Sequence, residues 1–148
     1  MWRCYPGGIS CVVPKGDWLK RLGLGASADK IGTEDSICIR VPDSTVLAYL
    51  VSLSGPVALT SANPSGGEDS THHDMVISSL GNKLAGVVCD GASNEQVAST
   101  VVNCMRIDEG VINFIRLGCV SKEVVDAHFE AAKEDIKSSF ENCRHSKL

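Results

Sequence analysis

The sequence has 148 residues, of which 43% are apolar and 22% are charged, and its formal net charge is −4. These values are typical of one globular domain built around a single hydrophobic core. The acidic balance argues against tight, nonspecific binding to nucleic acid, although it allows a local basic groove. No apolar stretch is long enough for a membrane-spanning helix, and the first residues lack the apolar segment of a signal peptide.

The first third of the chain predicts two strands and two helices. Residues 9–13 follow a Pro-Gly-Gly turn and indicate a strand, and residues 17–22 indicate a short helix that ends at Gly23. Residues 26–35 are small and polar, so we expect a loop there. The start of the sequence resembles the interior of a domain, because it enters a turn and a strand with no preceding element.

Residues 36–41 alternate between apolar and polar side chains, which predicts a second strand. The apolar residues at 37, 39 and 41 would share one face, and Ser36, Cys38 and Arg40 would share the other. Pro42 then stops the strand. A polar residue at 43 or 44 can cap a helix that ends at Gly55.

The rest of the chain predicts four strands and two helices. We expect the strands at residues 57–60, 86–89, 99–103 and 111–116. We expect the helices at residues 71–81 and from Ser121 onward, with a loop at 61–70 that is rich in Ser, Gly, Pro and Asn. Because strands and helices are interleaved, the sequence predicts an α/β fold: a twisted mixed sheet with flanking helices.

The chain has seven cysteines, and no two of them show the C-x-x-C spacing of a zinc or redox site. Several lie within apolar runs, such as Cys38 and Cys89, so we expect reduced, buried thiols rather than disulfides or metal ligands. His72 and His73 have no third ligand at a suitable spacing, and the sequence therefore predicts no metal site.

The first candidate site is the segment TSANPSG at residues 60–66, which directly follows a predicted strand. Ligands of open α/β sheets bind outside the carboxyl ends of the strands. Hydroxyl and amide side chains, together with backbone N–H groups freed by a turn, suit phosphate oxygens. The alternative interpretation is an ordinary loop made of turn-forming residues.

The second candidate is Arg40, whose guanidinium could hold a carboxylate or a phosphate through two hydrogen bonds. The alternative is a salt bridge or a solvated edge strand. Ser99, Thr100 and Arg116 lie near the ends of predicted strands and are weaker candidates. For them, the competing interpretations are strand-edge hydroxyls and a surface arginine.

Five segments of the sequence form one ordered set: YPGGISCVVP at 5–14, SICIRVPD at 36–43, GPVALTSANPSG at 55–66, ASTVV at 98–102 and FIRLG at 114–118. In order and spacing they resemble the motifs of the YrdC-like family of threonylcarbamoyl-AMP synthases. The resemblance extends from residue 5 to about residue 128. The resemblance implies a twisted α/β sheet, similar to the fold of double-stranded-RNA-binding domains, around a positively charged concavity.

The resemblance also implies a nucleotidyltransferase that joins L-threonine, bicarbonate and ATP into threonylcarbamoyl-AMP, with release of pyrophosphate. Mg²⁺ would accompany ATP, and the product would pass to the tRNA-modification machinery. Residues that would contact threonine are Arg40, Leu59 and Ser99, and residues that would contact the nucleotide and its phosphates are Ser36, Ser61, Asn63 and Arg116. No protein residue is implied to be catalytic. Such enzymes are expected in the cytoplasm, and in mitochondria as well.

The sequence departs from the family at several positions. Members carry an N-terminal section with a Lys-x-Arg motif that binds the phosphates of ATP, and this sequence has no counterpart. Tyr5 replaces the usual tryptophan, and Gly8, Asn103 and Leu117 also differ from the family's residues. We therefore expect the C-terminal portion of a YrdC-like domain at residues 1–133, without the N-terminal part, followed by a polar tail at 134–148.

Two other functions are compatible with the sequence. The chain could be an inactive module of the same fold that binds a nucleotide, or contacts RNA weakly, without catalysis. It could also be the related domain of a carbamoyltransferase that matures hydrogenases, although the zinc-finger cysteine spacing of that protein is missing.

Overall fold

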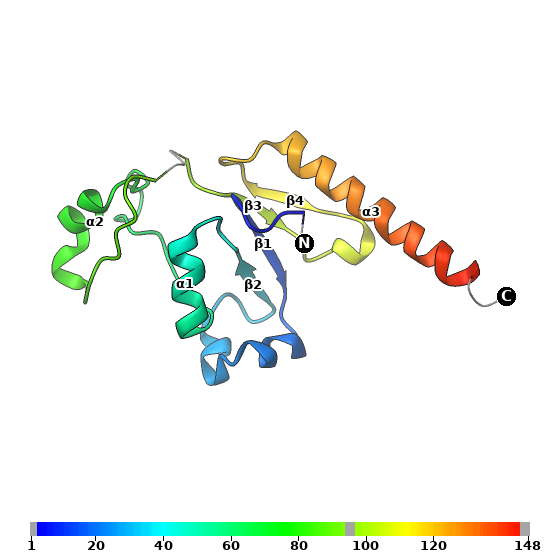
Figure 1. Ribbon diagram of the computed structural model, residues 1–148, viewed down its shortest axis with the longest axis horizontal. Coiled ribbons are helices and arrows are strands. Elements are labelled where there is room, and N and C mark those ends of the chain that lie inside the picture. The colour runs from blue at the N-terminus through cyan, green and yellow to red at the C-terminus, as the bar shows by residue number, and fades with distance from the viewer. Residues whose placement is uncertain (1–2, 94–96, 146–148) are drawn as a thin grey trace.

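The computed structural model describes residues 3–93 and 97–145. Four strands form one mixed sheet, and the chain also forms three α-helices and several short 3₁₀ helices, with the second α-helix set apart from the sheet (Figure 1). The strands are β1 (Ile9–Pro14), β2 (Ser36–Ile39), β3 (Thr100–Asn103) and β4 (Asn113–Arg116). The α-helices are α1 (Thr45–Ser54), α2 (His73–Leu80) and α3 (Lys122–His145). The predicted α/β fold is therefore confirmed.

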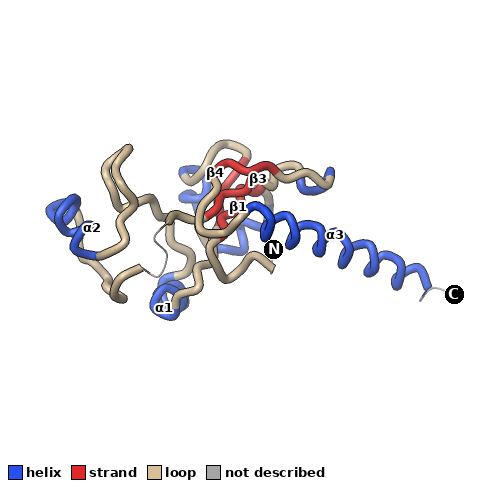
Figure 2. Tube along the Cα trace, turned by 90° about the horizontal axis from the view of Figure 1, so that it is seen from above, coloured by secondary structure: helices blue, strands red, loops and turns tan. Residues whose placement is uncertain are grey.

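The sheet has the order β2-β1-β3-β4. β1 lies at its centre, antiparallel to β2 and parallel to β3, and β4 is antiparallel to β3. The parallel β1–β3 pair brings together segments about 90 residues apart in the sequence, as its register of Ile9 with Thr100 shows. A strand near the N-terminus thus shares one sheet with two strands from the last third of the chain (Figures 1 and 2).

The hydrophobic core lies against one face of this sheet. The buried residues are Ile9, Cys11, Val13, Leu19, Ile37, Val102, Cys104 and Val125. Alternate residues of β1 supply three of them, as period-two patterning requires. α3 contributes Val125, and an ion pair between Arg3 and Asp135 (2.8 Å) joins the start of the described chain to the same helix.

Helix α1 begins and ends where the sequence predicts. Ser44 is its N-cap, and its side-chain oxygen accepts a hydrogen bond from the backbone N–H of Leu47 at 3.2 Å. Gly55 ends the helix with φ of 76°, in the left-handed region that glycine adopts without a steric penalty. The short helix at 17–22 is also present, as the 3₁₀ helix η1 (Asp17–Leu22).

Two predicted strands, at residues 57–60 and 86–89, do not form. Both segments are exposed; Leu59 retains 80% of its accessible surface and Val88 retains 72%. A β-strand needs a neighbouring strand to satisfy its backbone N–H and C=O groups, and neither segment pairs with a strand of the described chain. The apolar pattern alone was therefore misleading.

Two smaller predictions also need correction. The expected loop at 26–35 contains a 3₁₀ helix, η2 (Gly25–Lys30), because its Ala, Ser and Lys residues tolerate a helical turn. Cys38 and Cys89 are exposed rather than buried, whereas Cys11 and Cys104 are buried as expected. α3 runs through residue 133 to His145 without a break, and the division into domain and tail stays a prediction.

Within the described residues, no helix is both long and apolar enough to cross a bilayer.

Candidate functional site

The sheet face opposite the core is polar. Because side chains alternate along a strand, residues that neighbour the buried positions lie on this second face. The register pairs Ser10 with Val101 and Val101 with Arg116, so these three residues form a row across β1, β3 and β4. On β2, Cys38 pairs with Val12 and belongs to the same face.

Arg116, Ser99 and Ser10 are in direct contact on this face. The guanidinium of Arg116 donates to the backbone oxygen of Ser99 from Nε at 3.1 Å and from Nη2 at 2.9 Å. Nη2 also lies 3.3 Å from Ser99 Oγ. Ser99 Oγ in turn shares a hydrogen bond of 2.9 Å with the buried hydroxyl of Ser10. This chain of contacts fixes a positive charge beside two hydroxyl groups.

The turn after β4 holds Arg116 in this position. A Cβ at Gly118 would lie 2.0 Å from the backbone oxygen of Ala98, so only glycine can approach β3 so closely. Thr100, which is fully buried, secures the turn from the opposite face. Its hydroxyl donates to the backbone oxygen of Val120 at 2.5 Å and accepts from the N–H groups of Gly118 and Val120, at 2.9 and 3.2 Å.

Arg40 directly follows β2 and continues its alternation, on the side of Cys38. Its Nε donates to the backbone oxygen of Gly7 at 3.1 Å, and the N–H of Gly7 donates to the oxygen of Val41 at 2.8 Å. The terminal nitrogens of the Arg40 guanidinium make no hydrogen bond to any described residue. They are therefore available to a ligand carboxylate.

The Cys38 thiol reports the electrostatics of this face. Burial raises the pKa of Cys38, and the positive charge of Arg116 acts in the opposite direction. Ser36, at the start of β2, is half-buried, and its hydroxyl shares a hydrogen bond of 2.7 Å with that of Thr33.

Leu59, Ser61 and Asn63 lie in a separate segment, which no described hydrogen bond links to the sheet. Figures 1 and 2 both show α2, which follows this segment, beside the sheet rather than against it. Leu59 and Ser61 are exposed. Asn63 donates from Nδ2 to the backbone oxygen of Gly67 at 2.9 Å, and its Oδ1 is buried with no donor among the described residues. Such an acceptor is typical of a ligand or water site.

The structure thus brings together Ser99 and Arg116, and it puts Ser36 and Arg40 on or beside the same face. Convergence with Leu59, Ser61 and Asn63 at a single site stays a prediction. Sequence reasoning assigned no role to Ser10, although it contacts Ser99. The available signal was a hydroxyl inside an otherwise apolar strand, at a position that alternation assigns to the polar face.

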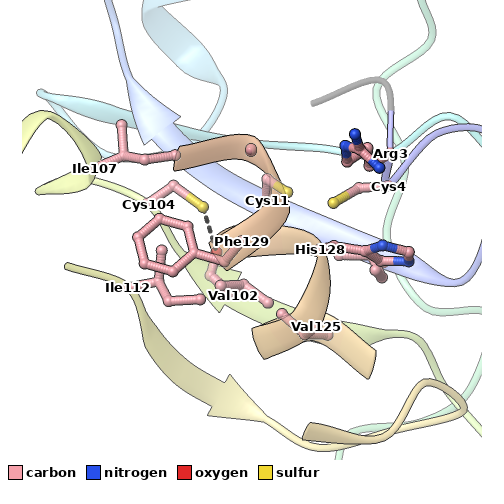
Figure 3. A pocket seen from close by; sticks show the side chains of 12 residues that line it. Arg3, Cys4, Cys11, Val102, Cys104, Ile107, Ile112, Val125, His128 and Phe129 are labelled. Carbon is pink, nitrogen blue, oxygen red and sulfur yellow. Dashed lines mark hydrogen bonds between the residues drawn. The ribbon is translucent and has the colours of Figure 1, made fainter. Parts of the chain in front are cut away.

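A small, largely apolar pocket lies on the other side of the sheet, beneath α3 (Figure 3). Three cysteines line it, Cys4, Cys11 and Cys104, together with His128 and apolar core residues. Two effects mainly raise the pKa of the Cys4 and Cys104 thiols: hydrogen bonding to Cys11, which is the larger, and burial. Both thiols therefore stay protonated at neutral pH. None of the predicted site residues lines this pocket, so it is separate from the polar face.

Comparison with known proteins assigns the family. The model of the Sua5/YciO/YrdC family, described as "Telomere recombination", matches residues 1–118. The chain belongs to this family. One curated relative is a threonylcarbamoyl-AMP synthase of Bacillus subtilis, 32% identical over 86% of this chain and 34% of the relative. Another is a putative threonylcarbamoyl-AMP synthase of Mycobacterium leprae, 36% identical over 79% of this chain and 49% of the relative.

Solved structures of family members show the same fold. P. abyssi Sua5 complexed with L-threonine superposes with a TM-score of 0.68 at 26% identity, over 85% of this chain and 34% of that protein. A double variant of P. abyssi Sua5 superposes with a TM-score of 0.71 at 24% identity, over 85% of this chain and 36% of that protein. The chain therefore spans between about a third and a half of the length of these relatives.

Proposed function

We propose that this chain carries the threonine- and nucleotide-binding surface of an L-threonylcarbamoyladenylate synthase. In the proposed reaction, the amine of L-threonine attacks bicarbonate and water leaves, which gives a carbamate. A carbamate oxygen then attacks the α-phosphorus of ATP, the bond to the β-phosphate breaks, and pyrophosphate departs. The observation that carries the proposal is the polar sheet face, on which Arg116, Ser99 and Ser10 are in contact and which Arg40 adjoins.

Arg40 is proposed to hold the carboxylate of threonine. A guanidinium matches a carboxylate with two parallel N–H donors, and the terminal nitrogens of Arg40 are uncommitted within the described chain. Ser99 adds a hydroxyl to the same ligand, and Leu59 an apolar contact. Support comes from P. abyssi Sua5, a family member whose structure was solved in complex with L-threonine.

Arg116 is proposed to face the nucleotide, together with Ser36, Ser61 and Asn63. Nucleotidyl transfer depends mainly on positioning and on neutralising charge that develops on phosphate oxygens, and a fixed guanidinium provides both. No carboxylate occurs among the described strand residues of the polar face. Mg²⁺ is therefore expected to enter with ATP, held by its phosphates, and it would withdraw charge from them.

The proposal is tested with the whole chain, L-threonine, bicarbonate, Mg²⁺ and labelled ATP. Threonine-dependent pyrophosphate and threonylcarbamoyl-AMP are the expected products. Arg40→Ala should raise the threonine KM roughly tenfold or more, because a hydrogen bond to a charged group contributes about 1.5–3 kcal/mol. The matched control is Arg21→Ala, which removes an exposed arginine in η1, away from the polar face. An equal KM for both variants would exclude Arg40 from the threonine site.

A second candidate function is ligand binding without catalysis. The observation in its favour is that Leu59, Ser61 and Asn63 lie in a segment that is not hydrogen-bonded to the polar face in the described structure. Binding of threonine or ATP by calorimetry, with no pyrophosphate formed, would favour this function. In the catalytic case, the product would supply the machinery that modifies tRNA with threonylcarbamoyladenosine.

A further inference from the structure

Three potential metal ligands meet at the start of α2. His72 Nδ1 lies 3.2 Å from Asp74 Oδ2, and His73 Nε2 lies 3.4 Å from Asp74 Oδ1. One ligand atom from each of the three residues lies within 4.8 Å of the other two. The three residues are consecutive in the sequence. The turn that leads into α2 folds both imidazole rings toward the Asp74 carboxylate, and the two ring centroids lie 4.0 Å apart.

The hydrogen bonds around these groups bear on which ring nitrogens can bind a metal ion. His72 Nδ1 accepts a long hydrogen bond, 3.3 Å, from the backbone N–H of Asp74, so its single lone pair is engaged there, and a metal ion bound to this nitrogen would replace that hydrogen bond. His73 Nδ1 lies 3.0 Å from Cys89 Sγ, and the sulfur also accepts from the N–H of Gly91 at 3.4 Å. The direction of this contact depends on the tautomer of the ring: where the sulfur accepts, the proton of His73 lies on Nδ1 and the lone pair on Nε2.

In that tautomer of His73, the ring nitrogens nearest the Asp74 carboxylate are both unprotonated. A cation between the three groups, either a metal ion or a proton, would then offset their mutual repulsion. Two imidazoles and a carboxylate are a typical ligand set for Zn²⁺ and similar divalent transition metals. The side chains of His72, His73 and Asp74 are 39%, 30% and 74% exposed, which leaves room for water to complete the coordination.

Cys89 is a second, independent feature of this arrangement, because it comes from another segment. A hydrogen bond of 2.8 Å from the N–H of Ser93 to the oxygen of Thr71 holds that segment beside the start of α2. Metal-binding histidines usually donate their second N–H to a nearby acceptor, which orients the ring and fixes its tautomer. Cys89 is placed to do this for His73.

We propose that His72, His73 and Asp74 form a binding site for a divalent transition-metal ion such as Zn²⁺, and that Cys89 orients His73 from outside the coordination shell. The site lies away from the polar sheet face and does not depend on the proposed synthase activity.

Isothermal titration of the whole chain with Zn²⁺ near neutral pH tests the site. Asp74→Asn should weaken Zn²⁺ binding by about tenfold or more, since it removes a charged ligand, and Cys89→Ala should weaken it by roughly tenfold, as is typical of outer-shell partners. Two matched controls, Asp69→Asn and Cys38→Ala, remove an exposed carboxylate and an exposed thiol outside the proposed site and should leave the affinity within about twofold of the wild-type value.

Circular dichroism of each variant separates loss of the site from loss of the fold. The buried thiols near α3 could also bind Zn²⁺, and in that case Asp74→Asn would bind as tightly as the wild type, which would overturn the proposal. A wild-type chain that takes up no Zn²⁺ would overturn it as well, and would assign a proton to the space between the three groups.

Discussion

Thr100 offers the sharpest test of how the polar face is built. Its hydroxyl is fully buried, and it is the shared partner of one backbone oxygen and two backbone N–H groups in the turn after β4. Thr100→Val keeps the shape of the side chain and removes all three hydrogen bonds. We expect the free energy of unfolding to fall.

The size of the effect follows from the three groups that lose their partner. Each buried polar group without a hydrogen bond costs about 1–3 kcal/mol. Gly118 and Val120 are half-buried, so water can reach part of the turn, and the total should be about 2–4 kcal/mol rather than the full sum. Thr100→Ser is the matched control: it keeps the hydroxyl and deletes one buried methyl group, at a cost of about 1 kcal/mol.

Urea denaturation followed by circular dichroism gives the free energies of all three proteins. The reasoning requires the order wild type, then Thr100→Ser, then Thr100→Val, from most to least stable. If the valine variant were at least as stable as the serine variant, the hydroxyl would not hold the turn, and the position of Arg116 would need another explanation.

Two further predictions concern the turn after β4 and the positive charge of Arg116, which this turn positions. Gly118→Ala would put a Cβ 2.0 Å from a backbone oxygen, so we expect a loss of more than about 2 kcal/mol in urea denaturation, and wild-type stability would show that the turn can move. Arg116→Ala should raise the pKa of Cys38, because the guanidinium favours the thiolate. Alkylation of Cys38, which requires the thiolate, should then shift to higher pH, and an unchanged pH profile would show that the two residues do not share a face.

Local patterns were sufficient where a segment carries its own boundaries. Strand β2 was predicted from alternation that ends at Pro42, and α1 from a polar cap and Gly55, and these signals are backbone constraints that hold in any context. The strands predicted at 57–60 and 86–89 rested on no backbone constraint of this kind. Their apolar residues are compatible with a strand, but pairing is a long-range property that composition does not specify.

The same limit of sequence-based prediction applies to the side chains of the candidate site on the polar face. Alternation predicted that Ser36, Cys38 and Arg40 would share a face, because that follows from backbone geometry within one strand. The contact between Ser99 and Arg116 joins residues 17 positions apart, and only the resemblance to the family suggested that both belong to one site. No such guide linked Cys89 to His73, whose contact at 3.0 Å became visible only in the fold, and the metal site proposed beside it stays a prediction.

Ser99 and Thr100 show why the stability of this sheet and the proposed ligand binding would be linked. As neighbours on one chain, they face opposite sides, so Thr100 anchors the turn after β4 from the core while Ser99 receives Arg116 on the polar face. The turn is short, and Gly118 brings it against the start of β3. A displacement of the turn therefore moves the guanidinium of Arg116 relative to Ser99 and Ser10. The proposed binding surface is thus preorganised by the same hydrogen bonds that hold the turn against the sheet.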